Sequence, residues 1–376
     1  MSVYLDCNAT TPIEPAVLEL VMKFMAEEFG NSGSRTHEYG NRAKVAVQNA
    51  RDQVAKAISA DREEVIFTSG ATESNNLAIL GLAAFGENSG RRHIISTEIE
   101  HKAVLEPLTF LRQRGFEVTL LPPEPGGYID PDRLMRALRP DTLLVSVMQV
   151  NNETGIIQPL NEICNRLIDH PAYLHVDAAQ GFGKYNGPLR NPRIDLVSVT
   201  AHKIYGPKGV GALISRRRGF DRPPLAPLMF GGGQERGLRP GTLPVHLIAG
   251  LGLAAELADK EAAGRQKQCE EYRFRLLKGL AALEPEFNGD QEWTLPNTVN
   301  LSIPGLDSEA FMLATKGLIA VSNGSACTSQ SYQPSHVLKA MGLELERVKS
   351  ALRFSWCHFT PPVDWLEVVA TVQNVR

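Results

Sequence analysis

Short apolar runs rich in β-branched residues alternate with amphipathic stretches through the first two-thirds of the chain. Runs and stretches of these lengths predict β-strands and α-helices that follow one another. We predict strands at 65–69, 93–97, 117–120, 142–147 and 173–176, and helices at 70–84, 101–114, 131–138 and 160–168. Repeated strand–helix pairs indicate an α/β fold, with a mostly parallel sheet covered by helices on both faces. Ligands of such sheets bind at the carboxyl ends of the strands.

A further apolar run at 195–199 ends in the polar segment Thr200-Ala-His-Lys203. A Gly-Pro-Lys-Gly turn and a second short strand at 210–215 follow it. Lys203 therefore lies just past a strand end, where loss of solvent can lower the pKa of its amine and make it a nucleophile. A lone lysine in this position is more often a surface residue of a hairpin.

A second strand end favours the chemical interpretation of this lysine. The segment from His175 to Gln180, His-Val-Asp-Ala-Ala-Gln, is again a strand that ends in polar residues, among them Asp177. Pyridoxal 5'-phosphate requires a lysine to bind its aldehyde and an aspartate to keep its ring nitrogen protonated. Lys203 and Asp177 on neighbouring strands match this requirement.

The segment Gly70-Ala-Thr-Glu-Ser-Asn-Asn follows a strand and opens a helix. A helix N-terminus after a glycine turn binds anions, because its first N–H groups are unpaired and the helix dipole attracts negative charge. Simple capping of the helix by Thr72 or Ser69 is the alternative. Because Lys203 and Asp177 occur in the same chain, we predict that Ala71 and Thr72 bind the phosphate of the cofactor.

The last third of the chain has a different organisation. Residues 221–244 are rich in proline and glycine and predict a long ordered loop, and 246–283 predicts a helical connection. Shorter strands and helices follow to the end and predict an α+β unit completed by the N-terminal arm. We therefore expect a large cofactor-binding domain at 16–258 and a small domain formed by 1–15 and 259–376.

Composition excludes several classes of protein. Of 376 residues 43% are hydrophobic and 22% charged, which is ordinary for a globular protein, and the net charge of −3 gives no general attraction for nucleic acid. The basic run Arg216-Arg217-Arg218 is expected to be a solvated strand end. The chain shows no membrane span and no signal peptide. Five scattered cysteines favour neither a disulfide framework nor a metal site, so we expect a reducing cytoplasm.

Several long motifs resemble those of one enzyme family. They are HVDAAQ, SVTAHKIYGPKGVG, YLDCNATTP and LRFSWCHFT, and together they cover nearly the whole chain. The chain is similar in all of them to the class V aminotransferases, and within these to the cysteine desulfurases of the NifS/IscS type. The resemblance implies a pyridoxal-phosphate-dependent transferase of fold type I, with a seven-stranded sheet in the large domain and a smaller α+β domain.

The resemblance also implies roles for individual residues. Lys203 would bind the cofactor and move the Cα proton of the substrate, and Asp177 would pair with the ring nitrogen. His101 would stack on the ring and act as acid or base, although a lone histidine there is more often a cap. The remaining contacts would be Gln180 and Asn152 to the ring oxygen, Thr200 and His202 to the phosphate, and Thr242 to the phosphate of the partner subunit in a homodimer.

Arg353 lies on a predicted inner strand, in Leu352-Arg-Phe-Ser355. A buried arginine requires a carboxylate, and the α-carboxylate of the substrate would fit through a forked pair of hydrogen bonds, with Asn152 as a further substrate contact. A structural ion pair is an equally good interpretation.

Cys327 lies in the segment Val321-Ser-Asn-Gly-Ser-Ala-Cys327, whose small polar residues predict an exposed loop. The resemblance makes Cys327 the nucleophile that takes the sulfur of L-cysteine as a persulfide, so that L-alanine leaves. A selenocysteine lyase, or another lyase or aminotransferase of the same fold, is the alternative enzyme, and a cofactor-holding scaffold that docks partners is an alternative of another class. We expect Cys7, Cys164, Cys269 and Cys357 to be structural.

The sulfur acceptor is a partner protein whose identity stays open. The candidates are an iron–sulfur scaffold, a tRNA-thiolating enzyme and the DNA phosphorothioation machinery. The segments YLDCNATTP and SRTHEYG closely resemble the desulfurase of the last, which we favour. The acidic balance of the chain implies that partner proteins would contact the DNA.

Overall fold

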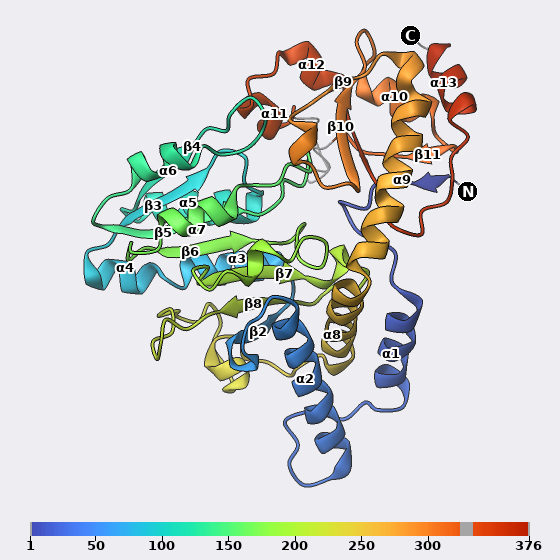
Figure 1. Ribbon diagram of the computed structural model, residues 1–376. Helices are drawn as coiled ribbons and strands as arrows, with labels where there is room; N and C mark the ends of the chain where they lie inside the picture. Colours follow the sequence, from blue (N-terminus) through green and yellow to red (C-terminus); the bar gives the residue numbers. More distant parts are fainter. Residues whose placement is uncertain (1, 324–333, 375–376) are drawn as a thin grey trace.

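The computed structural model describes residues 2–323 and 334–374. Its central element is a seven-stranded sheet in the order β2-β8-β7-β6-β5-β3-β4 (Figure 1). The strands are β2 (Val65–Thr68), β3 (His93–Thr97), β4 (Glu117–Leu121), β5 (Thr142–Met148), β6 (Tyr173–Asp177), β7 (Leu196–Thr200) and β8 (Gly211–Ser215). Neighbouring strands are parallel except in the two pairs that include β8. The predicted α/β fold with a mostly parallel seven-stranded sheet is confirmed.

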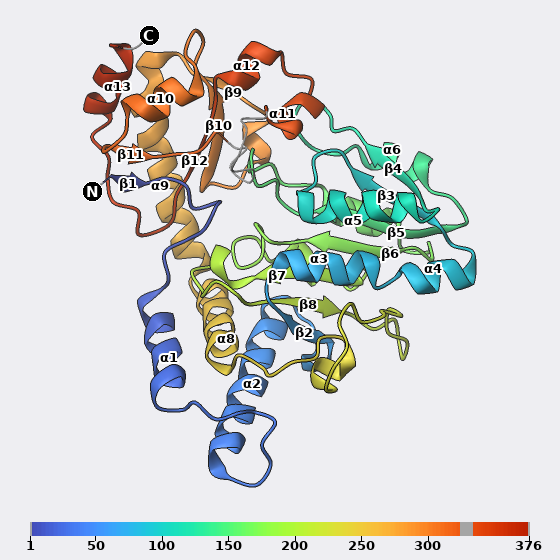
Figure 2. The ribbon, with the colours of Figure 1, turned by 180° about the vertical axis from the view of Figure 1, so that it is seen from behind.

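Helices cover both faces of this sheet (Figures 1 and 2). Side chains alternate between two apolar cores along each strand, as Ile94 and Ile95 of β3 show by belonging to opposite ones. Helices α3 and α5 contribute to one core, and α1, α2, α6, α7 and α8 to the other. The helices are α1 (Pro15–Ala26), α2 (Glu38–Ala57), α3 (Ala71–Leu80), α4 (Ala83–Ser89), α5 (Lys102–Gln113), α6 (Pro131–Ala137), α7 (Leu160–Arg166) and α8 (Val245–Lys260).

A separate apolar core lies beneath a small antiparallel sheet of order β12-β10-β9. Helices α9, α10 and α13 pack on it, and Leu5 of the N-terminal arm is part of the same core. The elements here are β1 (Val3–Tyr4), β9 (Glu286–Phe287), β10 (Thr298–Ser302), β11 (Ile319–Ala320), β12 (Ala351–Ser355), α9 (Ala262–Leu280), α10 (Ser308–Ala314), α11 (His336–Ala340), α12 (Leu345–Lys349) and α13 (Trp365–Gln373). The domain boundaries near residues 15 and 258 stay a prediction.

Two predicted helices are each divided in the structure. The stretch 70–84 forms α3 and α4, because the carbonyl oxygen of Gly81 accepts the N–H of Ala226 at 2.8 Å and is lost to the helical ladder. The helical stretch at 246–283 is divided at Glu261, where α8 ends and α9 begins. The first of these differences depends on a contact that is distant in the sequence.

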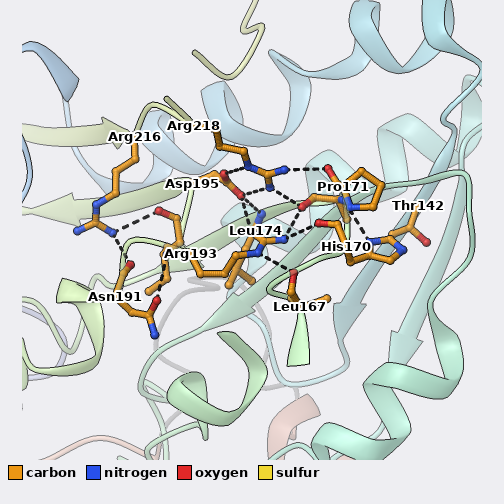
Figure 3. A network of polar contacts seen from close by, with 12 residues as sticks. Thr142, Leu167, His170, Pro171, Leu174, Asn191, Arg193, Asp195, Arg216 and Arg218 are labelled. Atoms are coloured by element: carbon orange, nitrogen blue, oxygen red, sulfur yellow. Dashed lines mark hydrogen bonds and ion pairs between the residues drawn. The ribbon is translucent and has the colours of Figure 1, made fainter. Parts of the chain in front are cut away.

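The expectation of a solvated basic run at 216–218 is wrong for Arg216 and holds for the exposed Arg217 and Arg218. Arg216 is buried, and its guanidinium donates to the carbonyl oxygens of Ile58 and Leu189, both at 2.7 Å. Figure 3 shows the guanidinium of Arg218 on the buried carboxylate of Asp195, at 2.6 and 2.8 Å. Arg216 therefore bonds to neighbouring loops instead of facing solvent, and Arg218 combines its ion pair with partial exposure.

Across the described parts of the chain, the helices include none long and apolar enough to cross a membrane. The histidine, cysteine and carboxylate side chains of these parts also form no cluster of three that could hold a metal ion.

Candidate active site

One cavity of about 630 Å³ opens at the carboxyl ends of the parallel strands. The predicted site residues that line it are Ala71, Thr72, His101, Asn152, Asp177, Gln180, Thr200, His202, Lys203 and Arg353. Thr242 is exposed and does not line this cavity. Cys327 lies outside the described residues. The structure thus brings together side chains from six separate segments, as the prediction required, and their individual roles stay predictions.

Lys203 ends the short turn Ala201–Lys203 that follows β7. Its Nζ donates to the carbonyl oxygen of Asn8 and, at 2.7 Å, to that of Ala9. The same arm is fixed to the turn by Thr11, whose N–H donates to the carbonyl oxygen of His202 at 3.0 Å. The turn and the N-terminal arm therefore hold the amine inside the cavity.

Asp177 is the last residue of β6, and its side chain is only 5% exposed. One carboxylate oxygen accepts from Nδ2 of Asn75 at 2.7 Å, and the other accepts from the N–H of Ala179 at 2.9 Å. Within residues 2–323 and 334–374 the carboxylate makes no ion pair. A buried carboxylate without a cation is stable only with such donors, and it would bind a positively charged ring nitrogen strongly.

The N-terminus of α3 is the candidate anion site. Gly70 precedes the helix with φ of 153°, which favours glycine, and Ser74 is the first residue whose N–H bonds back within the helix, at 3.1 Å to Gly70. The N–H groups of Ala71 and Thr72 precede that bond and face the cavity end of the helix. Thr200 lies beside this turn, since its Oγ1 is 3.6 Å from the place of a Cβ on Gly70.

His202 and Lys208 lie at the same end of the cavity. Burial, together with the charges of Lys203 and Lys208, lowers the pKa of His202 to about 4. The imidazole is therefore neutral at pH 7 and can donate or accept without adding charge. Its Nδ1 is 3.2 Å from Oγ1 of Thr10.

His101 has the capping role that the sequence left open, and its ring also lines the cavity. As N-cap of α5 it accepts the N–H of Ala103 at Nδ1, at 3.0 Å. A neutral ring then carries its proton on Nε2. Capping therefore fixes the orientation of the ring at the wall of the cavity.

Arg353 of β12 is buried, and it makes the structural ion pair that was one of its two interpretations. Its Nη2 lies 2.6 Å from Oδ1 of Asp6, and its Nη1 donates to the carbonyl oxygen of Asn152 at 3.0 Å. Its Nε, however, has no acceptor in the described part of the chain. The ion pair is thus established, and binding of a substrate carboxylate stays a prediction.

Asn8 is a site residue that the sequence reasoning missed. Its carbonyl oxygen accepts from Lys203 and from Nε2 of Gln180 at 2.9 Å, and its Nδ2 donates to the carbonyl oxygen of Asn152 at 3.2 Å. Its position inside the motif YLDCNATTP was the only available signal. Asn75, whose side chain donates to Asp177, was also missed. Its position inside the segment that opens α3 was the only signal for it.

Comparisons with known proteins agree with this geometry. The family model described as "Aminotransferase class-V" matches residues 3–364. The cysteine desulfurase IscS of Methylococcus capsulatus is 48% identical over 365 residues, which are 97% of this chain and 90% of the relative. The corresponding enzyme of Methylobacillus flagellatus is 47% identical, over 95% of this chain and 88% of the relative.

Solved structures of other proteins are also similar to this chain in sequence and in fold. DndA from Streptomyces lividans is 56% identical and superposes with a TM-score of 0.84, over 93% of this chain and 98% of that chain. A structure described as SspA in complex with cysteine is 36% identical with a TM-score of 0.83, over 96% of this chain and 100% of that chain.

Proposed function

This chain belongs to the class V aminotransferase family, and on that premise we propose that it is a cysteine desulfurase that uses pyridoxal 5'-phosphate. It converts L-cysteine into L-alanine and transfers the sulfur to a protein acceptor. The observation that carries the proposal is the cavity itself, which holds the amine of Lys203, the unpaired carboxylate of Asp177 and the N-terminus of α3. A scaffold whose main role is to dock partners would have no need of an amine placed for catalysis.

The residues present fit the cofactor at three points. The N–H groups of Ala71 and Thr72 fit a phosphate, the buried carboxylate of Asp177 fits a protonated ring nitrogen, and Lys203 supplies the primary amine. Pyridoxal phosphate, when bound, supplies the electron sink for reactions at the Cα atom of an amino acid. Lys203 would hold the cofactor and then move the Cα proton of the substrate at Nζ.

Neighbouring residues would orient the substrate and handle a second proton. His101 is fixed by its cap at Nδ1, so Nε2 is the atom that would donate or accept. The Nε of Arg353 is buried and unpartnered among the described residues, and the α-carboxylate of L-cysteine would satisfy it. We place both groups in the catalytic machinery.

Cys327 would receive the sulfur. Its thiolate attacks the sulfur of the substrate, the carbon–sulfur bond breaks, and Cys327 becomes a persulfide while the carbon skeleton leaves as L-alanine after protonation. This assignment rests on the resemblance of the segment that contains Cys327, which the structure does not describe.

We also propose that the protein is a homodimer. Support comes from the exposed apolar side chains of Leu18, Met22, Met25 and Phe29, which recur at helical spacing along α1 and just beyond its end. The loop 221–244 exposes Phe230 to 90% and carries Thr242 on its surface. A second copy that covers these groups would bring Thr242 towards the partner's cofactor phosphate.

For the acceptor we favour the DNA phosphorothioation machinery. The supporting observation is that identity to DndA, at 56%, exceeds the 47–48% identity to the IscS enzymes. The net charge of −3 favours partner proteins for any DNA contact. The proposed location is the cytoplasm, where the buried free thiols of the described cysteines would stay reduced.

The test combines chemistry and labelling. The purified protein should form alanine and sulfide from L-cysteine in the presence of dithiothreitol, and borohydride reduction should place the pyridoxyl label on Lys203. The variants Lys203→Ala and Cys327→Ala should lose the activity, whereas Lys260→Ala, an exposed lysine of α8, should keep it.

Each alternative has its own outcome. Turnover that persists in Cys327→Ala would favour a selenocysteine lyase or another lyase of the same fold. Labelled sulfur that passes only to an iron–sulfur scaffold would exclude phosphorothioation as the pathway. A protein that binds no pyridoxal phosphate would overturn the proposal.

A further inference from the structure

Two cysteines that the proposed chemistry does not use lie against each other beside the active site. Cys7 and Cys357 are 1% and 3% exposed, and they form one small apolar cluster with Tyr205. Backbone pairing holds them together, because the N–H of Cys7 donates to the carbonyl oxygen of Ser355 at 3.0 Å. Their thiols lie close enough for each to shift the pKa of the other.

The surroundings shift the pKa values of the two thiols in opposite directions, so that Cys7 keeps its proton and Cys357 is the thiol that ionises. The thiol of Cys7 lowers the pKa of Cys357 to about 7, with further help from Thr360, whose Oγ1 is 3.3 Å from its sulfur, and from the charge of Lys184. The thiol of Cys357 and burial raise the pKa of Cys7. Cys164, a buried cysteine of α7 without such neighbours, has its pKa raised to about 12 by burial.

We propose that Cys7 and Cys357 form a redox-active dithiol that closes reversibly to a disulfide. With a peroxide as oxidant, the Cys357 thiolate attacks one oxygen and becomes a sulfenic acid while hydroxide leaves. The Cys7 thiol then attacks that sulfur, water leaves, and the sulfur–sulfur bond forms. Two electrons pass from the two sulfurs to the peroxide, and a dithiol such as dithiothreitol returns them by exchange.

A second cavity lies next to the residues that surround this pair. It measures about 340 Å³, and Tyr205, Lys184 and Cys269 are among the residues that line it. Tyr205 contacts the Cys7–Cys357 cluster from this side, and Asn8, the neighbour of Cys7, lines the active-site cavity on the other. The dithiol therefore lies between two cavities, although both sulfurs are shielded from bulk solvent.

The dithiol is also connected to the amine of the proposed active site. Asn8 follows Cys7 directly, and its carbonyl oxygen accepts from both Lys203 and Gln180. Lys184, whose charge acts on both cysteines, donates to Oε1 of Gln180 at 3.3 Å. Closing the disulfide removes the thiolate charge beside Lys184 and tethers the arm that binds Lys203.

The test uses the holoprotein with Cys327→Ala, so that the proposed nucleophile cannot contribute. It is treated with hydrogen peroxide or with oxidised glutathione, and peptides are mapped without reduction. We expect a peptide pair that links Cys7 to Cys357, faster migration on a non-reducing gel because the bond closes nearly the whole chain, and reversal by dithiothreitol. Adding Cys7→Ser should abolish the link, and adding Cys164→Ser should not.

Other outcomes would overturn the proposal: a disulfide that includes Cys269, sulfinic acid on Cys357 with Cys7 still free, or no oxidation of either residue. Should Cys7→Ser fail to fold, isotope-coded alkylation of the Cys327→Ala protein still decides, because the two thiols must disappear together, one for one. The peptide map does not require turnover, so it can be interpreted even if the proposed function is wrong.

Discussion

The carbonyl oxygen of Asn8 accepts a hydrogen bond from Nζ of Lys203, although 195 positions separate the two residues in the chain. Asn8 is held in place by its own side chain, which donates to the carbonyl oxygen of Asn152 and accepts from Oγ1 of Thr298, both at 3.2 Å. The N-terminal arm is thus part of the wall of the active site.

Replacing Asn8 by alanine should loosen the arm. Both side-chain hydrogen bonds are lost and the buried partners stay unpaired, so we expect the free energy of unfolding to fall by about 1–3 kcal/mol. Pyridoxal phosphate should also dissociate faster, which the visible absorbance of the dialysed protein measures. Asn88→Ala, at an exposed position of α4, is the control. Equal cofactor retention in both variants would contradict the role of the arm.

Glu100 gives a prediction about pH. Its carboxyl group is fully buried and accepts from Oγ1 of Thr97 and the N–H of Met148, both at 2.8 Å. Burial raises its pKa to about 8, so between the ordinary carboxyl pKa and pH 8 the folded state holds a proton that the unfolded state has lost. Stability from this group is therefore present at low pH and is lost as the pH rises, by at most about 1.4 kcal/mol per pH unit.

Glu100→Gln should remove that loss, because the amide mimics the protonated acid. We expect wild type and variant to have similar free energies of unfolding at pH 5, and the variant to be the more stable at pH 9. Urea titrations across this range measure both. Glu106→Gln, an exposed position of α5, should follow wild type throughout. Parallel curves for wild type and Glu100→Gln would show that Glu100 ionises normally.

Asp195 is the centre of a network of hydrogen bonds and ion pairs (Figure 3). Its carboxylate binds the guanidinium groups of Arg193 and Arg218 and accepts the N–H of Leu174 at 2.6 Å. Asp195→Ala leaves the buried guanidinium of Arg193 without its carboxylate, and we expect the free energy of unfolding to fall by roughly 3–5 kcal/mol.

The matched control is Asp141→Ala, which breaks the exposed ion pair with Arg139 and should cost at most about 1 kcal/mol. Chemical denaturation of both variants measures the difference. Similar losses would mean that the Asp195 network is no more than a surface ion pair.

Lys203 and Asp177, which the sequence placed in the active site, lie at the ends of strands, whereas Asn8, which it missed, does not. Lys203 and Asp177 follow directly on buried strands, and parallel strands bring their carboxyl ends to one edge, so local pattern and sheet topology suffice to place them. Asn8 lies in an arm whose position depends on pairing with β12 and on the Lys203 turn. No local pattern contains those contacts.

The same distinction explains the errors in the fold. The apolar pattern of 70–84 continues through Gly81, so that only the distant N–H of Ala226 divides the helix. Arg216 has a polar sequence context, yet the loops around Ile58 and Leu189 present carbonyl oxygens that need a buried donor. Burial of a charged residue is decided by such tertiary partners, which composition does not reveal.

Arg353 allows the two interpretations of one residue to be separated by experiment. The ion pair with Asp6 predicts a loss of stability when either partner is changed, and binding of the substrate carboxylate predicts a change in KM that depends on Arg353 alone. Arg353→Lys keeps the charge and loses the fork, so we expect the KM for L-cysteine to rise by roughly ten- to a hundredfold with a smaller change in kcat.

Asp6→Asn is the matched control, since it removes the ion pair and leaves the guanidinium in place. We expect it to lower the free energy of unfolding by roughly 1–3 kcal/mol while the KM changes little, because Nε and the bond from Nη1 to Asn152 remain. If both variants raise KM equally, Asp6 orients Arg353 for the substrate. If neither raises it, Arg353 is structural and the carboxylate of L-cysteine binds elsewhere in the cavity.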